Sequence, residues 1–188
     1  MGLPSFVGKS RAKAFEGIKD RVWKRLQDRK LKFLSQARKE ILLKAVIQTI
    51  HTYSLSVFRM PKTLCMEINA LMQNFWWGYK KNDKRIHWMS WEKMGLSKSR
   101  GGMGFRDLVA FNTALLAKQL WRLWKTTDSL TARILKAKYY PNCSILEVGL
   151  GSKPSFAWSS IHGAGGLVKD GLIWWIGNGA SIRIWGEK

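Results

Sequence analysis

The stretch from Arg100 to Lys125 constrains the fold most. Its glycines at positions 101, 102 and 104 interrupt regular structure, and the apolar residues after Asp107 recur every three or four positions, which predicts a helix. The polar strip of this helix consists of three cations on one face, Lys118, Arg122 and Lys125. Because most of the remaining circumference is apolar, we expect other segments to pack around a long central helix with Asp107 as its N-cap.

Apolar periodicity predicts three more helices, joined by short connections, in the N-terminal half. An amphipathic helix runs from Ser10 to about Lys30. A second helix is capped by Ser35 and continues to roughly Phe58. A third begins after Pro61 and ends at Gly78.

The middle of the chain alternates loops with short elements. The charged residues 79–85 predict an exposed loop, and the alternation from Ile86 to Trp91 predicts a short strand or an extended crossing. Glu92 to Gly104 has the composition of a turn with basic residues. After the central helix, Ser129 to Tyr140 predicts a short helix that stops at Pro141.

The last forty residues contain many glycines, which leave room only for short elements. The β-rich runs Leu172 to Ile176 and Ser181 to Trp185 flank Gly177-Asn178-Gly179, a strong hairpin signal. The expected fold class is therefore mainly α, a helical bundle around a long central helix, with a small C-terminal β-hairpin. Composition divides the chain into segments 1–78, 79–141 and 142–188, the last of which ends soon after the second predicted strand.

The charge of the chain predicts a polyanionic partner. Lys and Arg number 33 against 12 Asp and Glu, which gives a formal net charge of +21. Such a charge attracts the phosphate backbone of RNA or DNA through steering and counterion release. The alternatives are a solvated basic surface or an acidic partner chain. An anionic membrane surface is disfavoured because the cations are spread along the chain and not gathered on one amphipathic face.

The candidate nucleic-acid-binding residues are cations of the first helix, the glycine hinge and the central helix: Lys24, Arg25, Arg29, Arg106, Lys118, Arg122 and Lys125. Eleven tryptophans accompany them, and Trp121 stands beside Arg122. Aromatic rings next to cations can stack on unpaired bases. For most of the tryptophans, burial in the core is the stronger interpretation.

Motifs for enzymatic chemistry are missing from the sequence. The 12 acids are scattered singly, without the clustered carboxylates that hold two Mg²⁺ ions in nucleotidyl transfer. The three histidines and two cysteines lack metal-ligand spacing, and the hinge glycines lack the GK[ST] of a phosphate loop. We therefore expect no enzyme activity, no metal or other cofactor and no small-molecule substrate. Reduced thiols and the lack of a 20-residue apolar run predict an intracellular protein without a membrane span.

An ordered series of sequence blocks resembles a known family. The blocks are Tyr53–Gly78, Ile86–Met94, Gly101–Leu123, Leu135–Pro141, Gly151–Ile161 and Gly171–Trp185. Together they resemble the segment after the polymerase core in plant LINE-type (non-LTR) retrotransposon reverse transcriptases, before the zinc-binding and RNase H-like parts. They are also similar to short plant mitochondrial open reading frames derived from that segment. The resemblance extends from about Phe6 to Trp185.

The resemblance implies a thumb and connection region that holds a template-primer duplex or the element RNA. Residues 1–78 would be the basic thumb-like part and residues 79–141 the connection. The catalytic YxDD block, the endonuclease, the zinc-binding block and the RNase H carboxylates of the family have no counterpart in the sequence, so no catalytic residue is transferred. A packing role is the safer transfer for the matching blocks Phe105–Leu108 and Ala114–Arg122.

Three hypotheses of function follow. In the first, the chain is a non-catalytic remnant of a reverse transcriptase polyprotein that binds RNA or DNA backbone. In the second, it is an accessory segment of an active reverse transcriptase whose polymerase and RNase H domains lie elsewhere. In the third, it is a relic open reading frame without selected function. The nucleus and the mitochondrion are the candidate compartments.

Overall fold

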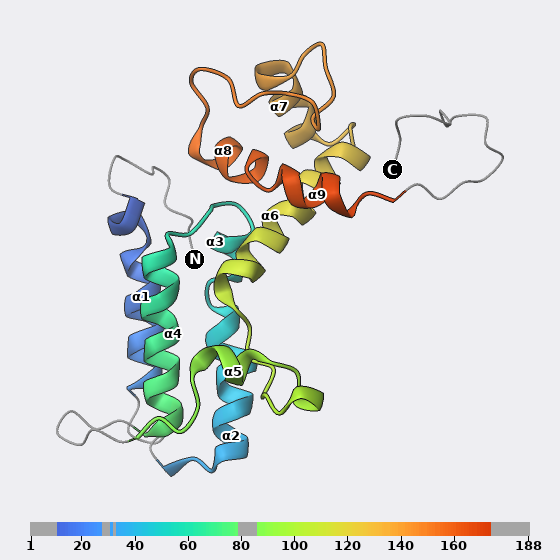
Figure 1. Cartoon of the computed structure of the whole chain (residues 1–188). Coiled ribbons are helices and arrows are strands. Elements are labelled where there is room, and N and C mark those ends of the chain that lie inside the picture. The colour runs from blue at the N-terminus through green and yellow to red at the C-terminus, as the bar shows by residue number, and fades with distance from the viewer. Residues whose placement is uncertain (1–10, 28–30, 32, 79–85, 174–188) are drawn as a thin grey trace. The chain divides into compact units, whose positions relative to one another are not determined.

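The computed structural model describes residues 11–27, 31, 33–78 and 86–173. These residues are mainly helical (Figure 1), which confirms the mainly α part of the expected fold class. By packing, the chain divides into two compact units, one up to Leu115 and the other from Leu116 onward. The division at 78 and 141 stays a prediction.

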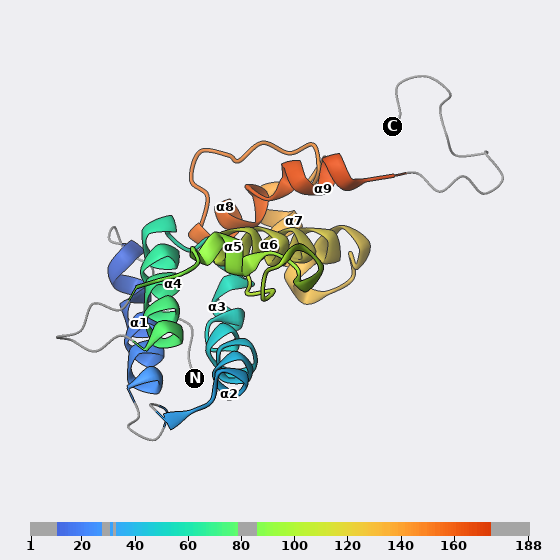
Figure 2. The ribbon, with the colours of Figure 1, turned by 60° about the horizontal axis from the view of Figure 1, so that its bottom comes forward.

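In the first unit, α1 (Arg11–Leu26) and α4 (Lys62–Trp77) lie side by side in both views (Figures 1 and 2). The apolar positions of α1 are buried at the spacing of a helix face, which is why this amphipathic sequence forms a packed helix. They are Phe15, Ile18 and Val22. Gly78 ends α4 with φ 74°, as predicted for a left-handed C-cap.

The second predicted helix is broken, so the expectation of one continuous helix from Ser35 to Phe58 is wrong. Helix α2 (Gln36–Ile41) passes into a π-helical turn at Leu42–Val46 and a 3₁₀ turn at Ile47–Thr49, before α3 (Thr52–Leu55). The Thr49 hydroxyl donates to the carbonyl oxygens of Ala45 and Val46, at 2.9 and 2.8 Å. These side-chain bonds compete with the regular backbone hydrogen bonds of an α-helix, in a stretch rich in β-branched residues.

Helix α6 (Leu108–Lys125) begins as predicted, with Asp107 as its N-cap. The Asp107 carboxylate accepts hydrogen bonds from the backbone N–H groups of Val109 and Ala110, at 2.8 and 3.4 Å. These bonds satisfy two N–H groups that lack a partner within the helix. The helix runs from the first unit into the second and contributes buried leucines to both cores.

Asn112 fastens the broken second helix to α6. Its side chain is 3% exposed. Its amide nitrogen donates to the carbonyl oxygens of Leu55 and Phe58, at 2.6 and 2.9 Å, and its amide oxygen accepts from the N–H of Met60 at 2.9 Å. The three bonds satisfy backbone groups left without partners where α3 ends.

The segment before α6 forms no strand over residues 86–90, so the strand alternative for Ile86 to Trp91 is wrong. Helix α5 (Trp91–Gly95) begins there because the Ser90 hydroxyl accepts from the N–H of Lys93 at 3.3 Å. A 3₁₀ turn at Lys98–Arg100 follows, so the turn predicted over Glu92 to Gly104 contains most of α5 and this 3₁₀ turn as well.

The glycines before α6 close a tight loop against α5. The N–H of Met103 donates to the Met94 carbonyl at 2.9 Å, and that of Gly104 donates to the Leu96 carbonyl at 2.8 Å. At Gly102 the backbone approaches Leu96 so closely that a Cβ would lie 2.1 Å from the Leu96 carbonyl oxygen. A residue without a Cβ is therefore required at this position.

In the second unit, α7 (Leu130–Tyr139), α8 (Phe156–His162) and α9 (Gly165–Gly171) accompany the later turns of α6. Helix α7 agrees with the helix predicted from Ser129 to Tyr140, and Ser129 caps it, with its hydroxyl accepting from the N–H of Ala132 at 3.3 Å. Trp158 is fully buried at the centre of this core. Of the predicted C-terminal hairpin, only Leu172 and Ile173 are described, and neither is in a strand; the rest lies outside the described residues.

His51 is buried at the break in the second predicted helix. It is 0% exposed, and in the described part of the chain neither ring nitrogen has a hydrogen-bond partner. Burial, reinforced by the positive charge of Arg106, lowers the pKa of His51 to about 4. The folded first unit therefore holds a neutral imidazole at neutral pH.

Substitution of Gly102 by alanine tests the close approach to Leu96. We expect Gly102→Ala to lower the free energy of unfolding by about 1 to 3 kcal/mol, because backbone must move to admit the Cβ. In the same unit, Gly17→Ala is the matched control, since a Cβ there meets nothing within 4 Å and should stabilise α1 by up to about 1 kcal/mol. Urea denaturation followed by circular dichroism measures both, and equal effects would contradict the geometry.

Removal of the Asn112 amide should destabilise the first unit. We expect Asn112→Ala to cost at least about 2 kcal/mol in urea denaturation, because two carbonyls and one N–H lose their partner in a buried place. The neighbouring Thr113→Ala is the control, since its hydroxyl bonds only to the Val109 carbonyl of its own helix. A loss for Asn112→Ala no larger than for Thr113→Ala would be evidence against this role.

The pH dependence of stability should report on His51. The unfolded chain takes up a proton near pH 6.5 and the folded chain only near pH 4, so the stabilising contribution is fully present above about pH 6.5 and is lost as the pH falls toward 4. Between about pH 7 and pH 5 we expect the free energy of unfolding to fall by on the order of 2 kcal/mol. In His51→Leu, this pH-dependent fall in the free energy of unfolding should be absent. An unchanged pH profile in that variant would show that His51 is not its cause.

Candidate nucleic-acid interface

The later turns of α6 carry a strip of exposed side chains, Lys118, Trp121, Arg122 and Lys125, called here the α6 strip. Their spacing of three, four and seven positions from Lys118 places them on one helix face. The three cations are exposed, and Trp121 is 42% exposed. Ion pairs among the described residues involve Lys19, Lys44 and Lys98, and none involves this strip. Its cations are therefore available for an external anion.

Aromatic rings accompany the cation at the end of the α6 strip. The Lys125 ammonium lies 5.4 Å from the ring centroid of Trp121 and 4.9 Å from that of Trp124. The two indoles meet edge to face, with ring centroids 5.2 Å apart and an angle of 63° between their planes. This arrangement combines a phosphate-binding charge with aromatic surface, the two features of proteins that bind single strands.

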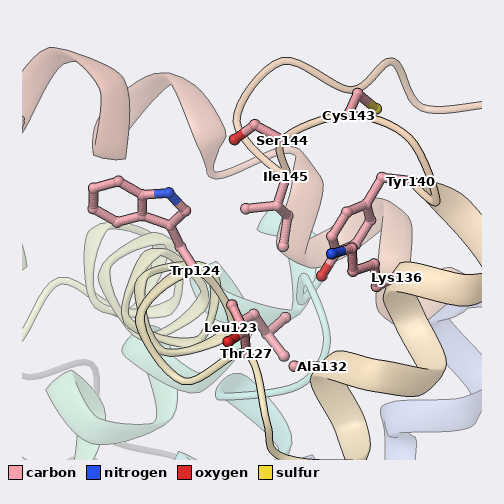
Figure 3. Close-up of a pocket in the computed structure, with 9 residues that line it drawn as sticks. All are labelled: Leu123, Trp124, Thr127, Ala132, Lys136, Tyr140, Cys143, Ser144 and Ile145. Atoms are coloured by element: carbon pink, nitrogen blue, oxygen red, sulfur yellow. The ribbon is translucent and has the colours of Figure 1, made fainter.

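A pocket of about 190 Å³ opens beside Trp124 (Figure 3). It is called here the Trp124 pocket, and its lining comes from the end of α6, from the connection to α7, from α7 itself and from the turn after α7. The lining residues are Leu123, Trp124, Thr127, Ala132, Lys136, Tyr140, Cys143, Ser144 and Ile145. None of them is acidic. The pocket combines apolar and aromatic surface with hydroxyl groups and one ammonium group.

Tyr140 is held rigidly in the wall of the Trp124 pocket. Its ring stacks on that of Trp158, with centroids 5.6 Å apart and planes 17° from parallel. Burial raises the pKa of Tyr140, so its phenol stays a neutral O–H group that can donate a hydrogen bond. Trp158 in turn stacks on Tyr139 at 4.8 Å, and this aromatic stack fixes one side of the pocket.

On α1, Lys24 and Arg25 are exposed neighbours in the last turn of the helix. Arg29 lies outside the described residues. Cations in this position also interact favourably with the helix dipole, so their placement has a structural explanation besides a functional one. Trp23, between α1 cations in the sequence, is 47% exposed.

Arg106 lies in the first unit, at the hinge before α6. Its side chain is exposed, and its guanidinium carbon lies 4.6 Å from the centroid of the Phe111 ring. The stacking holds the guanidinium against the start of α6. The structure thus gathers three of the predicted cations on the α6 strip and two at the end of α1, while Arg106 stacks on an aromatic ring.

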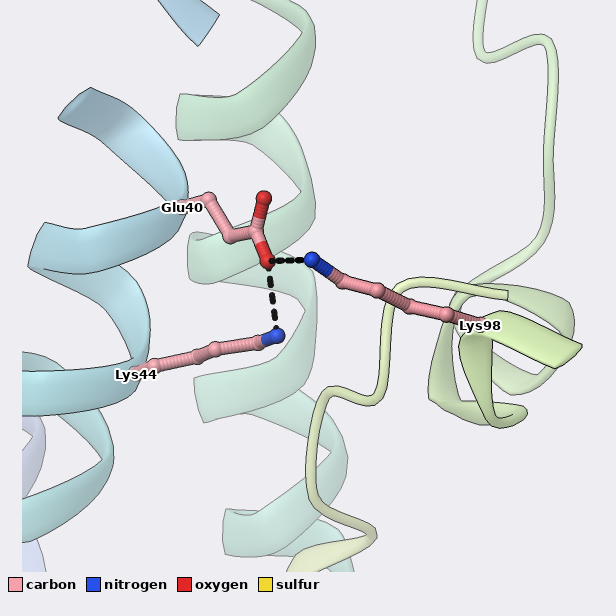
Figure 4. A network of polar contacts seen from close by, with 3 residues as sticks. All are labelled: Glu40, Lys44 and Lys98. Atoms are coloured by element: carbon pink, nitrogen blue, oxygen red, sulfur yellow. Dashed lines mark hydrogen bonds and ion pairs between the residues drawn. The ribbon is translucent and has the colours of Figure 1, made fainter. Parts of the chain in front are cut away.

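Other cations of the first unit serve internal ion pairs. The same oxygen of Glu40 accepts from the ammonium groups of Lys44 and Lys98, at 2.8 and 3.3 Å (Figure 4). The hydrogen bond from Lys44 holds the pKa of Glu40 below its ordinary value. The network ties α2 and the π-helical turn after it to the 3₁₀ turn at Lys98–Arg100. Lys19 similarly pairs with Glu67 of α4 at 2.7 Å.

Sequence reasoning found the cations of the α6 strip but missed the pocket beside it. The spacing of Lys118, Trp121 and Arg122 already places the indole on the basic face. The pocket carries no such signal, because Lys136, Tyr140 and Cys143 come near Trp124 only through tertiary packing. In the part of the chain that the structure covers, no three His, Cys, Asp or Glu residues gather as metal ligands, and no helix is both long and apolar enough to span a bilayer.

Comparison with known proteins finds two plant relatives. The chain is 41% identical to the uncharacterized mitochondrial protein AtMg00310 of Arabidopsis thaliana over 137 residues, which cover 72% of this chain and 89% of that protein. It is 32% identical to the putative ribonuclease H protein At1g65750 of Arabidopsis thaliana over 177 residues, or 93% of this chain. The match spans 28% of that longer relative.

No family model and no solved structure matches the chain. The two relatives are consistent with a retrotransposon-related plant protein, the coarser part of the resemblance in the sequence. The identity to the mitochondrial relative extends over nearly all of its length. The chain therefore belongs to the plant protein family that includes the uncharacterized mitochondrial protein AtMg00310.

Proposed function

We propose that this chain is a non-catalytic remnant of a plant LINE-type reverse transcriptase polyprotein that binds the phosphate backbone of RNA or DNA. The observation that carries the binding function is the α6 strip, where three exposed cations and a half-exposed indole share one helix face without an ion-pair partner in the described part of the chain. The net charge of +21 supports the same partner.

The relatives support the origin in a polyprotein. Nearly the whole chain matches 28% of a putative ribonuclease H protein, as a segment of a longer protein would. The order of the sequence blocks fits the region after the polymerase core. The same 28% coverage fits equally well the second candidate, an accessory segment of an active reverse transcriptase. The mitochondrion is the compartment that the name of the other relative supports.

Three of the twelve acids have structural contacts, which agrees with a non-catalytic role. Glu40 and Glu67 are engaged in ion pairs, and Asp107 caps α6. Each of these carboxylates thus has a structural task in the first unit. A primer-extension assay on the pure chain should be silent under this proposal, and extension of a primer would contradict it.

Neutralising the α6 strip should weaken nucleic-acid binding and reduce its salt dependence. For the variant Lys118→Gln, Arg122→Gln, Lys125→Gln, we expect the slope of log affinity against log salt to shrink by about 2, because each lost phosphate contact removes about 0.7 to 0.9. Fluorescence anisotropy with a labelled single-stranded oligonucleotide, repeated over a range of salt concentrations, measures the slope.

The matched control removes two lysines and one arginine elsewhere in the second unit, as Arg133→Gln, Lys153→Gln, Lys169→Gln. These three side chains are also exposed, so net charge falls equally. The control should keep most of the slope. Equal losses in both triple variants would show that binding is not localised on the strip, and affinity that does not change with salt would exclude backbone binding.

A further inference from the structure

We propose that the Trp124 pocket receives one unpaired base of a single-stranded nucleic acid whose backbone lies along the α6 strip. This inference rests on the proposed function, because the strip supplies the phosphate contacts. It adds a preference for single strands over duplexes and names the part of the ligand that enters the protein. The whole site lies within the second unit.

The size of the pocket suits one base. Pockets for drug-sized ligands have volumes of about 300 to 1,000 Å³. At about 190 Å³ the Trp124 pocket accepts a smaller group, such as a single ring system. A base in a duplex is stacked and paired, so it reaches such a pocket only after it is taken out of the helix, whereas a base in a single strand is already free to enter.

The walls of the pocket match the surfaces of a base. Figure 3 shows the Trp124 indole on one side and Tyr140 on the other, with Leu123 and Ile145 between them. Aromatic and aliphatic surfaces favour the flat faces of any base, since every base has a π-face. The phenol of Tyr140 and the ammonium of Lys136 offer hydrogen-bond donors, which suit the carbonyl and ring-nitrogen acceptors on base edges.

Charge links the pocket to the α6 strip. The Lys125 ammonium, the last cation of the strip, lies 4.9 Å from the centroid of the Trp124 ring that lines the pocket. A phosphate at Lys125 is therefore next to the pocket, so its attached base needs only a short reach to enter. Lys136 adds a second positive charge, and the absence of acids among the lining residues leaves nothing there to repel the backbone.

Cys143 offers a direct test, because it lines the pocket and is exposed. The other cysteine, Cys65, is buried, and burial raises its pKa to about 11, so an alkylating reagent reacts selectively with Cys143 in the folded chain. The full chain is treated with N-ethylmaleimide alone, with oligoadenylate, with oligodeoxyadenylate, and with a duplex of the same length, each nucleic acid at a saturating concentration.

We expect at least one single strand to slow the alkylation of Cys143 by about tenfold, and the duplex to leave the rate nearly unchanged. Protection by only one of the two single strands would identify RNA or DNA as the ligand. Cys143→Ser should abolish the reaction, which confirms the site of modification. Equal protection by duplex and single strands, or protection by none of them, would overturn the proposal.

A pair of variants tests the stacking. Trp124→Leu should lower the affinity for the protecting single strand by about tenfold and leave duplex affinity unchanged. Trp88→Leu, an exposed tryptophan of the first unit, should change neither. Single-strand affinity that is equal in both variants would contradict base insertion.

Failure of this inference is distinguishable from failure of the proposed function. If the pocket takes no base, neutralising the α6 strip still reduces binding and its salt dependence, while Cys143 stays fully reactive. If the strip binds no nucleic acid, neutralising it lowers the affinity and the salt dependence no more than the control triple variant does.

Discussion

The apolar circumference of α6 is the constraint on which both units depend. An 18-residue helix with so few polar positions is not stable in water, so both units bury it: Leu108 and Asn112 belong to the core of the first, and Leu116, Leu120 and Leu123 to that of the second. The face of Lys118, Trp121, Arg122 and Lys125 remains exposed and can contact other molecules. The candidate interface is thus a by-product of how the helix is buried, and its position follows from the hydrophobic pattern.

Local signals in the sequence predict the parts of the fold that depend on neighbouring residues. The start of α6 at Asp107 and the end of α4 at Gly78 are confirmed because caps act within one helical turn. The end of α3 is not predictable in this way, because Asn112, more than fifty residues away, supplies partners for the backbone groups that are freed there. Helix α9 was missed because its glycines disfavour a helix. Helix α8 contains no glycine and was missed because it lies between glycine-rich turns; Trp158 of α8 and Val168 of α9 both pack into the core of the second unit. The spacing along one helix likewise predicts the basic strip, whereas the Trp124 pocket depends on tertiary packing and is not predictable from the sequence.

The block from Phe105 to Leu108, one of those that resemble the retrotransposon family, has a structural explanation at each position. Phe105 is buried and stacks on Trp91, with ring centroids 4.9 Å apart, Asp107 caps α6, and Leu108 is fully buried. Arg106 stacks on Phe111. A sequence block that resembles a family can therefore reflect how a helix packs in its unit. Similarity in this block supports a shared fold more strongly than a shared catalytic activity. The proposed function then rests on the exposed residues of the later turns.

Asn112 also bears on whether this family is maintained by selection. Apolar core positions tolerate exchange among several side chains of similar volume. In contrast, Asn112 supplies two donated bonds and one accepted bond from a single buried amide, a combination that few other side chains can reproduce. Reading frames that drift without selection will lose such a residue as readily as any other, while frames whose products must fold will keep it. Whether family members keep an amide at this position therefore tests whether their products must fold.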